Sequence, residues 1–181
     1  GLSFKWRQDF IRTYLERDLR DLSAISALGD FRRLMRAACS RLGQLVNQTE
    51  LGRDATLPQP TVHRYLNLLE TSYLLVRLPA YAASRNKRLI RSPKLYWVDT
   101  GLALHLAGGE GPRAAHLENF ILHDLLAWRD ARPDHAGLYY WRTAVGEEVD
   151  LVIEAGGRLL PIEIRATGRP RVGDADHLRI F

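Results

Sequence analysis

The stretch EVDLVIEAGGRLLPIEIR, residues 148–165, decides the fold of the second half of the chain. Apolar and polar residues alternate on both sides of Gly156-Gly157, which is typical of two strands that each bury one face. A Gly-Gly pair between such strands favours a two-residue hairpin turn, because glycine adopts positive φ without strain. With these glycines as the turn, Ala155 pairs with Arg158, and this pair sets the register of the antiparallel hairpin.

Two acidic side chains meet across this hairpin. In the predicted register Asp150 lies directly opposite Glu163, and Arg165 follows two residues later on the same face. Carboxylates about 5 Å apart repel unless a cation lies between them or one is protonated. Mg²⁺ takes oxygen ligands from one or two carboxylates, so Asp150 and Glu163 are candidate metal ligands. A purely structural alternative pairs Arg165 with Glu148, which face each other in the same register.

Composition places the chain among globular proteins. Its 181 residues include 26 Lys and Arg against 21 Asp and Glu, a net charge of +5, and 46% of them are hydrophobic. These values exclude collagen-like, disordered and disulfide-scaffold classes. The single cysteine, Cys39, lies in an apolar run and has no partner in the chain, which predicts a reducing, cytoplasmic compartment. No apolar run is long enough to predict a membrane span.

The pattern of turns and hydrophobic spacing predicts an α+β protein with two regions. A helical region over 1–108 is expected to contain a winged helix-turn-helix, because helix, turn, helix and a two-stranded ribbon follow one another. An α/β region is expected over 109–181. Asp30, Thr49 and Asp99 are expected helix N-caps. The predicted helices cover about 4–22, 30–42, 50–53, 61–71, 101–106 and 113–129. The predicted strands cover 73–78, 95–98, 138–141, 148–154 and 159–165.

Two sets of residues are candidates for nucleic-acid contact. In a winged helix the second helix of the motif enters the major groove. The connector between the two strands of the ribbon has basic residues and no acidic ones, so it is suited to phosphate. A basic connector is also compatible with plain solvation or with packing against another domain. The candidate readers are Gln59, Thr61, Arg64 and Asn67, and the candidate phosphate contacts are Arg85, Lys87 and Arg88, in a connector that also contains Lys94.

The helix over 113–129 is expected to bury Leu117, Ile121, Leu125 and Trp128, with Glu118 at the rim of this stripe. The second half has no cluster of Cys and His with the spacing of zinc ligands. It also has no Gly-x-Ser-x-Gly nucleophile motif.

Several motifs resemble the C-terminal region of a widespread prokaryotic family of AAA-type ATPases. That resemblance implies a winged-helix segment followed by a domain of unknown function similar to the PD-(D/E)XK nuclease fold. It also implies a P-loop ATPase domain in the full-length protein, and no phosphate-loop motif occurs in this chain, so no bound nucleotide is expected here. The motifs are Tyr14-Leu15-Glu16-Arg17-Asp18-Leu19, Ser92-Pro93-Lys94-Leu95-Tyr96, Leu117-Glu118-Asn119-Phe120, Glu148-Val149-Asp150 and Pro161-Ile162-Glu163-Ile164.

The resemblance implies a catalytic set made of Glu118, Asp150, Glu163 and Arg165. The family pattern has lysine where this chain has Arg165. Arginine stays protonated and is a poor general base, so it stabilises charge but does not take a proton from water. The resemblance therefore implies a degenerate nuclease-like site. The start at Gly1 and the end soon after this motif are typical of a piece of a longer protein.

Three functions are compatible with these features. The favoured one is an accessory region of the ATPase that binds nucleic acid through the winged helix. The second is an Mg²⁺-dependent DNA nuclease, in which a metal-activated water attacks phosphate. The third is a protein-interaction or oligomerisation module that couples movements of the ATPase to a partner, and a homo-oligomer is compatible with this function. The expected partners are DNA and the ATPase domain of the same protein. No interaction with a membrane is expected.

Overall fold

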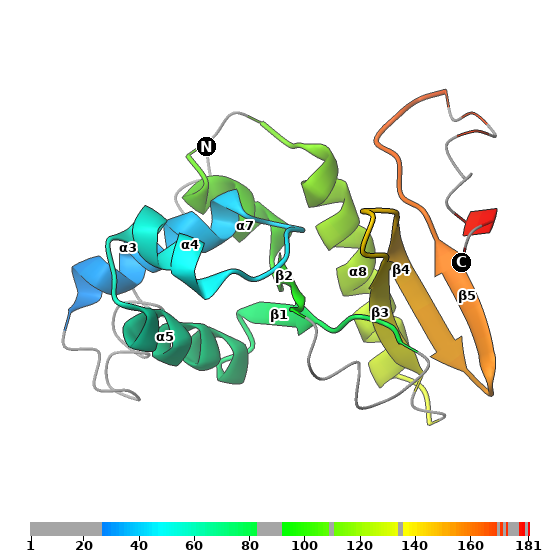
Figure 1. Ribbon diagram of the computed structural model, residues 1–181, viewed down its shortest axis with the longest axis horizontal. Helices are drawn as coiled ribbons and strands as arrows, with labels where there is room; N and C mark the ends of the chain where they lie inside the picture. The colour runs from blue at the N-terminus through cyan, green and yellow to red at the C-terminus, as the bar shows by residue number, and fades with distance from the viewer. Residues whose placement is uncertain are drawn as a thin grey trace. The chain divides into compact units, whose positions relative to one another are not determined.

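The computed structural model describes residues 27–82, 92–108, 111–133, 136–169, 171, 173, 178–179 and 181. The helix expected over 4–22 and the candidate residues Arg85, Lys87 and Arg88 lie outside this part of the chain. The described elements mix helices with antiparallel strands, which confirms the α+β class (Figure 1). The elements are α3 (Leu28–Ser40), α4 (Gln48–Ala55), α5 (Gln59–Thr71), β1 (Leu75–Leu78), β2 (Lys94–Trp97), α7 (Thr100–Leu106), α8 (Ala114–Asp130), β3 (Gly137–Arg142), β4 (Glu148–Ala155) and β5 (Arg158–Ile162).

The chain divides into two compact units, each built from several segments. The first unit contains 47–76 and the described parts of 1–41 and 97–111. The second contains 42–46 and the described parts of 77–96 and 112–181. None of the described helices is long and apolar enough to cross a membrane.

The core of the first unit forms between the apolar faces of α3 and α5. The stripe predicted for α5, Val62, Tyr65, Leu66 and Leu69, is buried as expected. Phe31 of α3 meets the ring of Tyr65 edge to face, with 5.2 Å between the ring centroids. Burying one large apolar side chain of this kind stabilises the fold by about 1.5–3 kcal/mol.

Asn47 is the residue that caps α4, so the expectation that Thr49 does so is wrong. The side chain of Asn47 accepts hydrogen bonds from the backbone N–H groups of Thr49 and Glu50, at 3.1 and 3.2 Å. Asp30 also fails as a cap, because α3 begins at Leu28 and places it within the first turn. Asp99 is confirmed as the cap of α7, accepting from the N–H of Leu102 at 2.6 Å.

A tight turn of residues 56–58 joins α4 to α5. Thr56 has φ 55°, and the N–H of Leu57 donates to the carbonyl of Gly52 at 2.8 Å. A Cβ on Gly52 would lie 2.7 Å from the carbonyl oxygen of Leu57, which is closer than real contacts allow. Glycine at position 52 is therefore required for this turn.

The second unit contains the hairpin anticipated from the sequence. β3, β4 and β5 form an antiparallel sheet in that order, and β4 pairs with β5 from Ala155↔Arg158 to Leu151↔Ile162. Gly156 and Gly157 have φ 56° and 75°. The predicted register is confirmed over these pairs, and regular pairing stops one position before Asp150 and Glu163.

The face that α8 buries differs from the predicted one. Its buried residues are His116, Asn119 and Leu122, whereas Leu117 and Trp128 are exposed by 36% and 37%. The Nδ1 of buried His116 accepts a hydrogen bond from the backbone N–H of Arg113 at 3.0 Å, which satisfies one of its two ring nitrogens. Apolar spacing alone therefore gave the wrong rotation for this helix.

Candidate functional site

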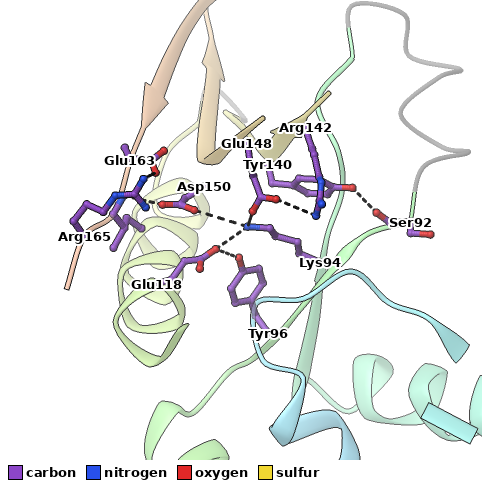
Figure 2. A network of polar contacts seen from close by, with 11 residues as sticks. Ser92, Lys94, Tyr96, Glu118, Tyr140, Arg142, Glu148, Asp150, Glu163 and Arg165 are labelled. Carbon is purple, nitrogen blue, oxygen red and sulfur yellow. Dashed lines mark hydrogen bonds and ion pairs between the residues drawn. The ribbon is translucent and has the colours of Figure 1, made fainter. Parts of the chain in front are cut away.

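An acidic cluster lies in the second unit, formed by Glu118, Glu148, Asp150 and Glu163. Glu118 comes from α8, Glu148 and Asp150 from β4, and Glu163 follows the last residue of β5. Figure 2 shows Glu118, Glu148 and Asp150 around the side chain of Lys94, and Glu163 on the other side of Asp150 beside Arg165. The structure thus brings the four residues of the implied catalytic set into one region.

Lys94 lies at the end of the basic connector that the sequence suggests as a phosphate contact. Its side chain is nevertheless only 3% exposed. Its Nζ lies 2.5 Å from Glu148 Oε1, 3.1 Å from Glu118 Oε1 and 4.0 Å from Asp150 Oδ1. Burial alone would lower the pKa of Lys94, but the carboxylates of Glu118 and Glu148 outweigh it and raise that pKa above its usual value. Lys94 is therefore a buried ammonium and not a phosphate contact.

Glu118 accepts from two donors at the same oxygen. Besides Lys94, the hydroxyl of Tyr96 donates a hydrogen bond to Glu118 Oε1. Burial raises the pKa of Glu118, and the nearby charge of Asp150 adds to this increase against the opposing effects of Lys94 and Tyr96. Burial and the charge of Glu118 raise the pKa of Tyr96, so its hydroxyl stays protonated as a donor.

Glu148 also pairs with a second cation. Arg142 Nη1 lies 3.3 Å from Glu148 Oε2, while Arg165 Nη2 lies 2.6 Å from Glu163 Oε1. The alternative pair of Arg165 with Glu148 is therefore wrong. Arg165 instead pairs with the carboxylate of Glu163.

Asp150 continues the hairpin through its side chain. Its Oδ2 accepts a hydrogen bond from the backbone N–H of Ile164 at 2.8 Å. This contact replaces the ladder bond that is lost where β5 ends at Ile162. One oxygen of the Asp150 carboxylate is thus engaged with the backbone just after the end of β5.

These residues do not fit a bound Mg²⁺ ion. Lys94 lies among three of the carboxylates, Arg165 pairs with Glu163, and Asp150 is engaged with backbone. Within the described residues, no group of three or more His, Cys, Asp or Glu side chains has the arrangement of a metal site. A divalent ion placed beside Lys94 would meet a buried positive charge, so no metal-dependent step is derived from this geometry.

The candidate nucleic-acid residues on α5 belong to the first unit. Gln59 and Arg64 are exposed, and Thr61 is half-buried. The guanidinium of Arg64 lies over the ring of Tyr65, 5.1 Å from its centroid. Asn67 is half-buried, and its Nδ2 lies 3.0 Å from Nε2 of His63.

His63 is an exposed residue that sequence reasoning did not select. Its ring lies between two side-chain amides, because its Nδ1 is 3.3 Å from Nε2 of Gln48 and its Nε2 contacts Asn67. The four-residue spacing from His63 to Asn67 places both on one face of α5, and this spacing was the signal available in the sequence.

Residues 2–113 match the model of a domain of unknown function, DUF8612, and residues 113–181 match a second one, DUF4143. DUF4143 is found in proteins associated with AAA ATPases. Uncharacterized proteins of Mycobacterium tuberculosis and Mycobacterium bovis are each 36% identical over 178 residues, covering 94% of this chain and 40% of the relative. An uncharacterized protein of Haemophilus influenzae is 32% identical over 91 residues, covering 47% of this chain and 23% of the relative. No solved structure matches the chain significantly.

Proposed function

The chain belongs to the DUF8612 family, and we propose that it is an accessory region of an AAA-type ATPase. In this proposal the chain binds nucleic acid without cleaving it. The second matched domain, which is found in AAA-ATPase-associated proteins, supports the link to an ATPase. The chain spans 40% of the length of its mycobacterial relatives, so the rest of such a protein has room for an ATPase domain.

The observation that carries the proposal is the exposed N-terminal half of α5. This helix follows α4 after a turn of residues 56–58, the length that joins the two helices of a helix-turn-helix. Gln59 and Arg64 project from that half, where a recognition helix meets base edges and phosphates. The order α3, α4, α5, β1 and β2 supports the winged form of the motif.

Electrostatics in the first unit also support binding to a polyanion. The two acidic residues of α4, Glu50 and Asp54, both pair with Arg41. Arg41 offsets one of these two negative charges, and Arg53 in the last turn of α4 carries a further positive charge. The exposed positive charge of Arg64 therefore meets phosphate without a strong opposing field.

The acidic cluster supports binding without cleavage. Metal-dependent hydrolysis of a phosphodiester needs an ion that activates water and neutralises charge on the phosphate. In this cluster Lys94 and Arg165 already pair with the carboxylates that would hold the ion. Arg165 also stays protonated and so is a poor base for the attacking water.

The test is a fluorescence anisotropy titration of the full chain with labelled duplex DNA over a salt series. We expect weak binding whose logarithm falls linearly with the logarithm of salt concentration. Arg64→Ala should reduce affinity for all sequences and lower this slope by about one. A triple variant should lower the same salt slope by up to about three, because it replaces Arg85, Lys87 and Arg88 by Ala.

Arg129→Ala is the matched control, because Arg129 lies on α8 in the second unit and pairs with its neighbour Asp130. Its affinity and salt slope should equal those of the wild type. If Arg64→Ala and the triple variant both bind DNA as the wild type does, the nucleic-acid proposal fails.

Two alternatives are separated by specific outcomes. Mg²⁺-dependent nicking of plasmid DNA by the wild type, lost in Asp150→Asn and Glu163→Gln, would establish a nuclease. A protein-interaction role is favoured by the exposed apolar side chains of α8, since Phe120 is 56% exposed. Loss of self-association in Phe120→Ser, with no DNA binding by the wild type, would support that role.

A further inference from the structure

We infer that Lys94 is the permanent cation of the acidic cluster, and that its ammonium group occupies the place a divalent ion would take among Glu118, Glu148 and Asp150. The centre then acts as a cation-independent link that joins β2 to α8 and β4. This inference concerns the second unit and does not depend on nucleic-acid binding.

The first step of the argument is the position of the ammonium group. Three carboxylate oxygens surround Nζ, those of Glu148 and Asp150 from β4 at 2.5 and 4.0 Å and that of Glu118 from α8 at 3.1 Å (Figure 2). The ring of Tyr140 lies on a further side, with its centroid 5.7 Å from Nζ. With a side chain only 3% exposed, Lys94 has no route to an alternative solvated position without opening the structure.

The second step is that the backbone around Lys94 is held in place. Leu45 pairs with Lys94 in an antiparallel bridge. The N–H of Leu95 donates to Gln44 O at 2.9 Å, and the N–H of Val46 donates to Pro93 O at 2.8 Å. These bonds lie on both sides of Lys94, so the start of its side chain is fixed.

The third step is that a lysine and a metal exclude each other here. Mg²⁺ binds oxygen at about 2.0–2.1 Å and demands near-octahedral ligands. An ammonium group at the centre of the same carboxylates takes the negative charge that would attract the ion. A divalent ion would therefore bind only if Lys94 were removed.

This gives a gain-of-function test. Lys94→Ala removes the ammonium and leaves three carboxylates facing one another. The variant should melt about 6–20 °C lower than the wild type in EDTA, because it leaves buried charges without their partner. Added Mn²⁺ or Mg²⁺ should restore part of this loss in a saturable manner, since the ion binds only the folded cluster.

The wild type should show neither a shift in melting temperature nor binding of Mn²⁺ by electron paramagnetic resonance at the same concentrations. Arg142→Ala is the matched control, because it removes a 43% exposed cation from the same network and leaves Lys94 in place. It should stay insensitive to both ions. Asp150→Asn added to Lys94→Ala should abolish the recovery.

Saturable Mn²⁺ binding by the wild type would overturn the inference, because the cluster would then accept a metal beside Lys94. Failure of both ions to stabilise a folded Lys94→Ala protein would also overturn it. If Lys94→Ala does not fold under any condition, Lys94→Gln keeps most of the side-chain volume and takes its place with the same expectation. Absence of ion-dependent stabilisation in both variants counts against the inference.

Discussion

Replacing Tyr96 by phenylalanine isolates one hydrogen bond of the acidic cluster. Tyr96 is 1% exposed, and its hydroxyl donates to the carboxylate of Glu118, which also contacts Lys94 at 3.1 Å. The ring remains, so no large cavity forms. A hydrogen bond to a charged group contributes about 1.5–3 kcal/mol, and we expect Tyr96→Phe to lower the free energy of unfolding by this amount at about pH 7.

The loss of stability in Tyr96→Phe should depend on pH, and the pKa of Glu118 determines whether it grows or shrinks as the pH rises. Burial raises the pKa of Glu118 while the hydroxyl of Tyr96 opposes the increase, so the pKa is higher still in the variant. A carboxyl whose folded pKa lies above its unfolded value contributes stability that is lost as pH rises through the folded value. The free energy of unfolding of the variant should therefore fall more than that of the wild type between about pH 4.5 and about pH 7. Near the lower pH the carboxyl is protonated in both proteins, so the difference in stability between them should shrink to roughly 0.5–1.5 kcal/mol, the contribution of a neutral hydrogen bond.

Urea denaturation of both proteins at the two pH values measures this. Tyr73→Phe is the control, because Tyr73 is 83% exposed and its loss of a hydroxyl should change stability by less than about 0.5 kcal/mol. A difference below about 0.5 kcal/mol for Tyr96→Phe at neutral pH, or one that does not change with pH, would refute the reasoning.

Two further predictions compare a substitution with a matched control, and a third concerns Arg165. Asn47→Ala should cost about 1 kcal/mol in denaturant unfolding because it removes the cap of α4, whereas Thr49→Ala should cost much less. Gly52→Ala should cost about 1–3 kcal/mol because its Cβ meets a carbonyl oxygen at 2.7 Å, and Gly29→Ala, whose nearest atom is 4.0 Å away, should be neutral or slightly stabilising in the same assay. Arg165→Lys should leave plasmid DNA uncut with Mg²⁺, because the buried lysine still holds the other carboxylates; cleavage by this variant would show that Arg165 alone blocks activity.

The hairpin of the second unit could be predicted because its signals are local. Gly156 and Gly157 set the turn, and the alternation beyond them set every pair out to Leu151↔Ile162. The buried face of α5 was equally readable, because its apolar residues repeat at helical spacing with few competing positions.

The role of Lys94 could not be predicted in the same way. It pairs with Glu118 and Glu148, which lie far along the chain, and no local pattern links a residue in a basic connector to carboxylates on another helix and strand. The rotation of α8 was missed for a related reason. His116 and Asn119 are buried polar residues, so an apolar stripe pointed to the wrong face.

The cap of α4 shows a limit of a different kind. Asn47 and Thr49 are both good capping residues and lie two positions apart. Sequence preference alone does not choose between them. The backbone decides, because Asn47 is extended and its side chain reaches two N–H groups of the first turn.

The position of Lys94 also limits how the two matched regions can be exchanged among relatives. Lys94 belongs to the region over 2–113, whereas the carboxylates that surround it belong to the region over 113–181. A chimera that joins the first region of one relative to the second region of another would keep a stable centre only if position 94 still carried a cation of the same reach. In natural sequences, loss of the lysine should be accompanied by loss of negative charge at 118 or 148, so the two regions are expected to change together despite the boundary between them.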